Sequence, residues 1–401
     1  MDERMRNIGK IEEFFRAGCK SQQLIGLELE HFLVDEKTKE SAQYEPTVRR
    51  LLEELAGAYG KPIFWEGNII GLAKDGAPIT LEPAAQIEIS IGPKEGLAEI
   101  KREYDNFFDL LAPLLARAGL ALETVGYQPK SKIGSMGLLP KKRYGIMHDY
   151  FKKSGLMGRH MMKGTAAAQI SIDYRDESDF KKKFRLANVL GPLFAFACDN
   201  SRVFEGEPFE GRMLRTQIWN NVCPARQGVV PGALDGDFGF FEYARYIYEL
   251  PAVLVPRGGS FEPAGLNSFA QEYAGRPLEF DDAAVLHATT MAFPDVALKS
   301  HIEIRMADSM PIDKALAYAA LIKGIFYDER NLCRLHDMTL GVGNCDVALA
   351  KSELALRGLC GAVYSRPAKD WLAEIFGTAR EGLRGDEARF FLPLEDFVWT
   401  A

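Results

Sequence analysis

Four short stretches of the chain alternate aliphatic residues with polar ones, at residues 25–32, 81–91, 168–173 and 301–306. In a β-strand such alternation places the two sets of side chains on opposite faces. The polar set consists of Glu28, Glu30, Glu82, Gln86, Glu88, Gln169, Ser171, His301, Glu303 and Arg305. We therefore expect a sheet with one aliphatic face and one face that carries several glutamates and an arginine.

Helical spacing of apolar residues separates these strands. The clearest helix covers residues 97–118 and is followed by Gly119, which suits a helix C-terminus. Further helices are expected at 1–20, 46–58, 176–198 (interrupted at 191–192), 241–248, 313–327, 345–356 and 368–383. Short strands are expected at 63–65, 69–72 and 120–127, with a hairpin at 253–261. Because helices and strands mix without a regular βαβ order, we predict an α+β fold with an antiparallel or mixed sheet.

The chain shows no repeat, low-complexity tract or clear linker. With 401 residues it is longer than a small domain, although one large catalytic domain remains compatible with this length. We predict a single catalytic domain over residues 1–401, with a sheet-containing core at 1–310 and a helical C-terminal part at 311–401.

Composition and charge narrow the class of protein. A hydrophobic content of 47% with 26% charged residues is typical of a soluble globular protein. The net charge of −7 argues against a general nucleic-acid or anionic-membrane binder. The six cysteines lack paired spacing, residues 1–15 are too charged for a signal peptide, and the apolar patch at 189–198 is too short to span a membrane. We expect a cytoplasmic protein.

The acidic face predicts metal chemistry. Carboxylates gathered on one face repel one another and raise each other's pKa unless a positive charge lies between them. Mg²⁺, with Mn²⁺ as the alternative ion, prefers such oxygen ligands and keeps open positions for phosphates. The candidate ligands are Glu28, Glu30, Glu82, Glu88 and Glu303. Arg305 is suitably placed to meet a phosphoryl oxygen. The alternative is that these glutamates lie on a solvated outer face.

Two basic segments provide further candidates. Arg212, Arg215 and Arg226 bracket Trp219 in a Gly/Pro-rich region, which forms either a solvated loop or a clamp for a carboxylate or phosphate. The run at 141–143, which includes Lys142 and Arg143, is either a solvated turn or part of a loop over a nucleotide. The sequence contains no P-loop, so ATP binding would require another scaffold.

Several segments, in their order, resemble glutamate–cysteine ligases of the plant-type branch, which also occurs in bacteria. They are GLELEHF (26–32), LEPAAQIEIS (81–90), GYQPK (126–130), PKKRYGIMHDYF (140–151), MMKGTAAAQISIDY (161–174), RTQIW (215–219), ARQGVVP (225–231), DFGFFEYARY (237–246) and FPDVALKSHIEIRMADSMP (293–311). The resemblance covers residues 20–330 and fades in the C-terminal part.

The resemblance implies a glutamine-synthetase-like fold, in which a curved, mainly antiparallel sheet forms a half-funnel with helices packed outside. It also implies an enzyme that uses ATP as co-substrate. The γ-carboxylate of L-glutamate would attack ATP to give γ-glutamyl phosphate, and the amine of L-cysteine would then displace phosphate. The product, γ-glutamylcysteine, would serve glutathione or a related thiol. Such phosphoryl transfer depends mainly on positioning and electrostatics.

The resemblance also implies roles for individual residues. Glu28, Glu30, Glu82 and Glu303 would bind Mg²⁺, with Glu88 as a fifth ligand. Glu303 and Arg305 are the expected catalytic residues, and Arg305 would meet the transferred phosphoryl group. The remaining positions would bind substrates. Gln169 would supply a further polar group of the active site, and Arg215 and Arg226 would bind the carboxylate of glutamate in a pocket walled by Trp219. Arg143 and the neighbouring lysines, including Lys142, would approach the phosphates of ATP.

Two departures from the plant-type pattern leave the amine acceptor open. This chain has Ala84 and Ala85 where the pattern has glycines, and Gln217 where it has histidine. One alternative is therefore a carboxylate–amine ligase of the same fold that joins glutamate to another amine. Another is a catalytically silent relative that binds metabolites. A monomer or a homodimer is expected.

Overall fold

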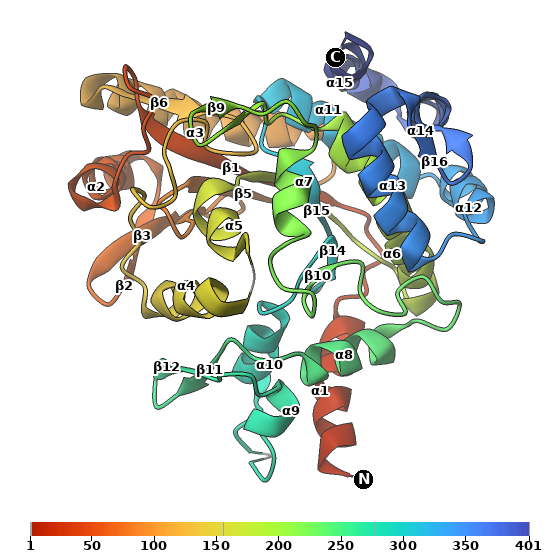
Figure 1. Ribbon diagram of the computed structural model, residues 1–401, viewed down its shortest axis with the longest axis horizontal. Helices are drawn as coiled ribbons and strands as arrows, with labels where there is room; N and C mark the ends of the chain where they lie inside the picture. Colours follow the sequence, from red (N-terminus) through yellow and green to blue (C-terminus); the bar gives the residue numbers. More distant parts are fainter. Residues whose placement is uncertain (1, 155, 277, 401) are drawn as a thin grey trace.

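The computed structural model describes residues 2–154, 156–276 and 278–400, and its main feature is a large sheet (Figure 1). Nine strands within these residues form it, in the order β14-β15-β7-β1-β5-β4-β3-β2, with β6 paired to the end of β1. They are β1 (Ile25–Asp35), β2 (Lys61–Trp65), β3 (Asn68–Ala73), β4 (Ile79–Leu81), β5 (Ile87–Lys94), β6 (Leu120–Glu123), β7 (Ala167–Ile172), β14 (Val296–Leu298) and β15 (Ile302–Asp308). Every pairing between these described strands is antiparallel.

The aliphatic face of the sheet packs against helices. Leu27, Ile89, Ile170 and Ile304 are fully buried on this face. The helices that contact the sheet strands are α2 (Arg49–Tyr59), α3 (Leu97–Ala118), α6 (Glu177–Ala197) and α11 (Ile312–Phe326). The burial of one face of each strand is the outcome that the period-two alternation predicts.

The strand register brings the polar residues of distant segments together on the other face. Glu28 in β1 lies opposite Ser90 of β5 and Gln169 of β7. Glu30 lies opposite Glu88. Glu303 in β15 lies opposite Ser171, one strand further along the sheet. The polar residues of four separate strands therefore form one continuous surface.

A bulge in β15 changes which side chains face this surface. Ile304 pairs with Ile170, but Ala168 pairs with Ala307, so one extra residue is inserted in β15. Beyond the bulge Asp308 lies opposite Ala167 and takes the same side of the sheet as Gln169. Simple alternation from Ile304 would have placed Asp308 on the aliphatic face.

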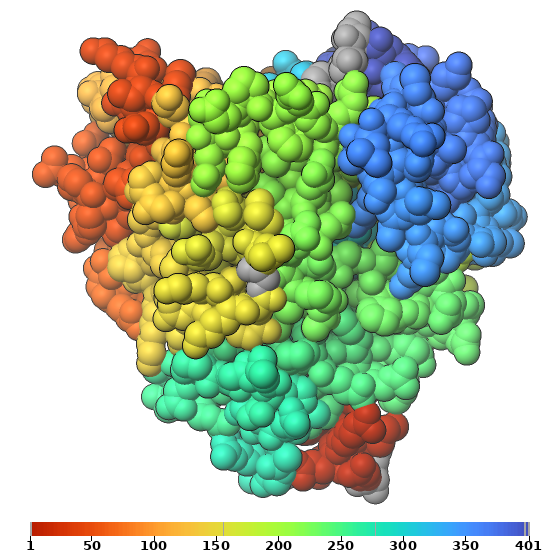
Figure 2. Space-filling model, in the orientation of Figure 1, coloured from red at the N-terminus to blue at the C-terminus, as the bar shows by residue number. Residues whose placement is uncertain are grey.

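Helices α4, α5 and α7 cover the polar face. They are α4 (Lys142–Ser154), α5 (Gly158–Gly164) and α7 (Leu214–Trp219). In Figure 1 they lie in front of the sheet, and Figure 2 shows their yellow and green segments on the surface beside the blue C-terminal helices. The polar face is therefore not the solvated outer face of the alternative interpretation. The sequence analysis did not predict α4 or α5 as helices.

Most of the other predicted elements are confirmed. Helix α3 ends at Gly119, whose φ of 65° is the left-handed conformation expected at a helix C-terminus. The predicted hairpin is β11 (Leu254–Arg257) and β12 (Ser260–Pro263), which turns at Gly258 and Gly259. The other α-helices before residue 310 are α1 (Glu3–Ala17), α8 (Phe240–Glu249), α9 (Phe269–Glu272) and α10 (Asp282–Thr289). The other short strands of this region, outside the large sheet, are β8 (Val203–Phe204), β9 (Glu207–Pro208), β10 (Gln227–Gly228) and β13 (Phe293–Pro294).

The expected interruption of α6 at residues 191–192 is wrong, because this helix is continuous from Glu177 to Ala197. Its second half is buried except for Phe196, and tertiary packing outweighs the hydrogen bond lost at Pro192. Gly191 allows a close approach to β15, since a Cβ there would lie 2.7 Å from Met306 Cε.

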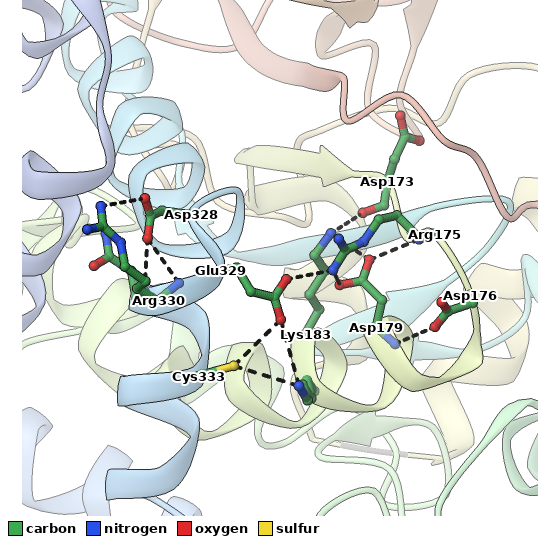
Figure 3. Close-up of polar contacts among 11 residues, drawn as sticks. Asp173, Arg175, Asp176, Asp179, Lys183, Asp328, Glu329, Arg330 and Cys333 are labelled. Carbon is green, nitrogen blue, oxygen red and sulfur yellow. Dashed lines mark hydrogen bonds and ion pairs between the residues drawn. The ribbon is translucent and has the colours of Figure 1, made fainter.

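The C-terminal part is mainly helical, as predicted, and packs on the core. After α11 it contains α12 (Glu329–Met338), α13 (Asn344–Arg357), β16 (Ala362–Val363), β17 (Arg366–Pro367), α14 (Ala368–Gly382) and α15 (Leu392–Thr400). Figure 3 shows that Arg175, just before α6, bridges Asp179 of α6 and Glu329 of α12, and that Lys183 pairs with Asp179 within α6. A single hydrophobic cluster extends from Ile8 to Val398. The boundary at residue 310 stays a prediction.

No helix within the described ranges has the length and apolar character needed to cross a membrane.

Candidate active site

A cavity of about 310 Å³ lies between the polar face of the sheet and helices α4, α5 and α7. Its lining combines buried and half-buried charged groups with apolar walls. The charged groups are Glu30, Glu82, Lys141, Arg143, Arg215 and Arg305, and the apolar walls include Tyr144, Met147, Met161, Trp219 and Phe293. The structure therefore brings together residues from six of the sequence segments that resemble the plant-type enzymes.

Gln169 connects the two glutamates of β1. Its Nε2 donates to Glu30 Oε1 at 3.1 Å and to Glu28 Oε2 at 3.4 Å. The backbone N–H of Ala167 also donates to Glu30, at 2.9 Å. The Oε1 atom of Gln169 is buried and has no hydrogen-bond partner among the described residues. Gln169 thus orients carboxylates and keeps one acceptor atom unused.

Burial and mutual repulsion perturb the carboxyl groups of this surface. Burial, reinforced by the charges of Glu303 and Glu88, raises the pKa of Glu28 to about 8. Burial and the neighbouring Glu82 raise the pKa of Glu88 to about 7, although Thr80 and Ser90 donate hydrogen bonds to it. Burial also raises the pKa values of Glu30 and Glu82. This cluster holds more negative charge than its surroundings offset, which favours the uptake of a cation.

Glu303 differs from the other carboxylates because two cations hold it. Lys299 Nζ lies 2.5 Å from its Oε1 atom, and Arg305 pairs with its Oε2 atom. Burial alone would raise the pKa of Glu303, but Lys299 and Arg305 lower it well below its ordinary value. Glu303 is therefore ionised throughout the neutral range.

The donor set of this surface fits Mg²⁺ in its chemistry. All five candidate ligands are carboxylates, which are the ligands that hard cations prefer. Within the described residues, however, no three acidic, histidine or cysteine side chains converge on one point as a ready-made metal cage. Glu303 is engaged in two ion pairs, and Glu28 and Glu30 each accept a hydrogen bond from Gln169. Metal binding would require these side chains to rearrange.

Arg215 and Trp219 carry hydrogen-bond donors at the cavity that no described residue satisfies. Both lie on α7, and the Arg215 guanidinium stacks over the Trp219 ring at 5.3 Å from its centroid. Arg215 is only 4% exposed, yet its Nε has no hydrogen-bond partner among the described residues, and neither does Trp219 Nε1. Burial lowers the pKa of Arg215, while the charges of Asp308 and Glu30 oppose that effect. A buried arginine in this state is suited to bind an anion.

Lys141 and Arg143, at the start of α4, form the basic side of the cavity. Arg143 donates to Thr290 Oγ1 at 2.9 Å, and the Lys141 ammonium lies over the Tyr144 ring. Burial lowers the pKa of both groups. Lys142, which the sequence analysis selected, does not line this cavity: it is exposed and donates to Ser260 Oγ at 2.9 Å. Successive side chains at the start of a helix point to different sides. Lys141 therefore lines the cavity at the position that was expected for Lys142.

Arg226 is also not brought to the cavity. It is fully buried and donates to the carbonyl oxygens of Met291 and Pro251, both at 2.7 Å, and to the Tyr150 hydroxyl at 3.0 Å. Its guanidinium packs against the ring of Phe293, which lines the cavity. The hydrogen bonds of Arg226 are used within the protein, so it supports the wall of the cavity and does not face a substrate.

Lys299 and Asp308 were missed from the sequence, and Lys141 was named only as one of the lysines beside Arg143. Lys299 had a usable signal, because it shares the parity of Glu303 and Arg305 across the turn between β14 and β15. Lys141 belonged to a run already noted, but the helix that orients it was not predicted. Asp308 had no signal in the sequence, because only the bulge in β15 turns it toward Arg215.

Comparisons with known proteins agree with this arrangement. The family model of glutamate–cysteine ligase family 2 (GCS2) matches residues 24–396. Glutamate–cysteine ligase B of Oryza sativa subsp. japonica is 31% identical over 393 residues, which cover 95% of this chain and 79% of the relative. The enzyme of Nicotiana tabacum is also 31% identical, over 94% of this chain and 74% of its own.

A solved structure shows the same fold. The glutamate–cysteine ligase of Francisella tularensis, determined in complex with AMP, superposes with a TM-score of 0.57 at 10% identity. The match covers 95% of this chain and 82% of that one. The α+β, glutamine-synthetase-like fold with an open, mainly antiparallel sheet and helices packed outside is therefore confirmed.

The expected cytoplasmic location is contradicted by these comparisons. The similar proteins of Oryza sativa, Nicotiana tabacum and Arabidopsis thaliana are all named chloroplastic. Sparse cysteines indicate a reducing environment but do not distinguish one reducing compartment from another. The match over almost the whole length, the shared fold and the cavity lined by both acidic and basic side chains together identify the chain as a member of glutamate–cysteine ligase family 2.

Proposed function

We propose that this protein joins L-cysteine to the γ-carboxylate of L-glutamate at the expense of ATP. The γ-carboxylate oxygen attacks the γ-phosphorus of ATP, which forms γ-glutamyl phosphate and releases ADP. The cysteine amine then attacks the acyl carbon, phosphate leaves, and the amine loses a proton. The product is γ-glutamylcysteine, a precursor of glutathione or a related thiol.

One observation carries this proposal: the same cavity holds two hydrogen-bond donors without a partner among the described residues, on Arg215 and Trp219, and the half-buried carboxylates of Glu30 and Glu82. Arg215 and Trp219 are available to bind an anionic substrate, because no described residue satisfies their Nε and Nε1 donors. Bidentate binding by a guanidinium suits the α-carboxylate of glutamate. Lys141 and Arg143, on the other side of the same cavity, are suited to the phosphates of ATP.

Mg²⁺, with Mn²⁺ as the alternative, is part of the proposal. Glu28, Glu30, Glu82, Glu88 and Glu303 would hold the ion, which when bound neutralises phosphate charge and orients the nucleotide. Arg305, which Glu303 holds in place, would stabilise the charge that develops on the transferred phosphoryl group. Gln169 would fix the orientation of Glu28 and Glu30 while substrates bind.

The test is ADP release by the purified protein with Mg²⁺, measured with and without each amino acid. We expect ADP release to require both glutamate and cysteine, and γ-glutamylcysteine to appear in equal amount. Glu303→Gln should lose at least 99% of turnover, whereas Glu36→Gln on an exposed turn should retain it. ADP release that is indifferent to cysteine would refute the proposed acceptor.

A panel of the twenty amino acids as acceptors tests the alternative of another amine. The proposal expects cysteine to give the highest kcat/KM. A higher value for a different amine would assign the protein to a carboxylate–amine ligase of the same fold, and Mg·ATP binding without turnover on any amine would indicate the silent relative. The monomer or homodimer expected from the sequence can be measured by light scattering.

A further inference from the structure

Lys299 is positioned by the tight turn between β14 and β15. Its backbone N–H donates to the carbonyl of His301 at 2.8 Å, which closes the turn. The side chain lies on the same side of the sheet as Glu303 and brings Nζ to 2.5 Å from Glu303 Oε1. Glu303 is completely buried, whereas the Lys299 side chain is one-third exposed. A lysine from the turn therefore extends over the edge of the acidic surface.

The ammonium of Lys299 has more than one acidic neighbour. Glu28 and Glu88 also attract it, in addition to Glu303. These three carboxylates come from β1, β5 and β15, and each is a proposed metal ligand. Without Lys299, a dissolved cation would therefore favour the position that the ammonium occupies within this cluster.

We propose that the Lys299 ammonium is a built-in cation of the acidic surface and takes the place of one divalent ion. This inference rests on the metal binding in the proposed function. It assigns to Lys299 a role in setting how many ions the surface accepts, because its ammonium adds a second positive charge beside Glu303, which Arg305 also contacts.

The alternative is a purely structural ion pair that only fastens the turn to β15. The two roles differ in what happens when the ammonium is removed. In a structural role, loss of Lys299 weakens the turn and leaves the number of bound ions unchanged. If Lys299 is a built-in cation, its removal leaves a carboxylate cluster that recruits one more divalent ion.

The experiment counts Mn²⁺ bound per chain by equilibrium dialysis with electron paramagnetic resonance of the free ion, without ATP or amino acids. Lys299→Met should bind one more Mn²⁺ per chain than the wild type, and Lys299→Arg should bind the same number as the wild type. The matched control is Lys20→Met, since Lys20 lies near the same turn but pairs with Asp173. Lys299→Gln replaces the Met variant if circular dichroism shows that the latter is unfolded.

The outcomes separate this inference from the proposed function. Equal Mn²⁺ counts in folded Lys299→Met or Lys299→Gln and in the wild type would overturn the role of Lys299 alone. A gain in Lys20→Met equal to that in Lys299→Met would also overturn it, because the effect would then reflect net charge. A wild type that binds no Mn²⁺ even with ATP and glutamate would contradict the proposed metal site, whatever the variants do.

Discussion

The ammonium of Lys351 on α13 lies 2.5 Å from the Oδ2 atom of Asp295, just before β14. Both side chains are largely buried, and the carbonyl of Asp295 accepts a hydrogen bond from the backbone N–H of Arg305 at 3.0 Å. A small second cavity touches Lys351, Asp295, Arg215 and Arg305 together. The C-terminal helices are therefore fastened to the wall of the candidate active site.

Breaking this pair should affect both stability and substrate binding. We expect Lys351→Met to lower the free energy of unfolding by about 3 kcal/mol, because Asp295 would keep a buried charge without its partner. The KM for glutamate should rise more than kcat falls, since the altered wall carries Arg215. Urea denaturation and steady-state kinetics measure the two effects. Lys369→Met on the exposed side of α14 is the control, and an unchanged KM in Lys351→Met would refute the link to the site.

Arg215 and Arg226 should respond in opposite ways to the same substitution. Arg215→Met should leave the free energy of unfolding no lower than in the wild type, because it removes a buried charge whose Nε has no hydrogen-bond partner among the described residues. It should raise the KM for glutamate by about 10- to 100-fold, the equivalent of charged hydrogen bonds worth about 1.5–3 kcal/mol.

Arg226→Met should instead lower the free energy of unfolding by about 3 kcal/mol, because it removes the donor to the buried carbonyl of Met291 and the half-buried carbonyl of Pro251. Denaturation curves of the two variants, measured side by side, test the contrast. Equal losses of stability would mean that Arg215 also has a structural role.

The raised pKa of Glu28 has a consequence for stability in the absence of divalent ions. Its folded pKa of about 8 lies above its ordinary value, so the folded state keeps a proton that the unfolded state has lost. The contribution of Glu28 to stability is complete below about pH 4.5 and is lost as the pH rises through about 8.

The free energy of unfolding of the wild type, relative to Glu28→Gln, should therefore decrease between pH 5 and pH 8, by up to about 1.4 kcal/mol per pH unit. Chemical denaturation in a chelating buffer at four pH values tests this, with Glu36→Gln as the control. A difference that stays constant with pH would refute it.

Ala85 occupies a backbone conformation that favours glycine. Its φ is +64°, and its N–H donates to the carbonyl of Glu82 in the turn that carries this proposed ligand. The left-handed conformation costs a residue with a Cβ about 1 kcal/mol. We expect Ala85→Gly to raise the free energy of unfolding by about 0.5–1 kcal/mol, whereas Ala84→Gly, without a positive φ, should lower it. Urea denaturation of both variants measures the difference, and a less stable Ala85→Gly would refute the strain.

The sequence was sufficient to predict the acidic surface. Alternation alone placed Glu28, Gln169 and Glu303 on one face, and the strand register confirms that they lie on neighbouring strands. Period-two patterning determines which face a residue takes, and this information is local. The order of the strands is not local, and it entered the sequence analysis only through the resemblance to a known family.

The residues that close the cavity were harder to predict, because their roles depend on tertiary contacts. Arg215 and Arg226 have similar sequence surroundings, but only the folded chain gives Arg226 two carbonyls and a hydroxyl to bind. Lys141 and Lys142 are adjacent in one basic run, and a helix that the sequence did not predict decides which of them faces the cavity.

The extra residue in β15 makes this strand unusually sensitive to changes of length. Deleting one residue between Ile304 and Ala307 would remove the bulge and leave Asp308 opposite Ala167, whereas inserting one residue there would move every later residue of β15 to the opposite face of the sheet. After such an insertion Asp308, which now accepts from Ser201 and the N–H of Asn200, would lie on the aliphatic face that packs against the helices. Working members of a mutant library should therefore tolerate exchanges of side chain at Met306 far better than an insertion beside it.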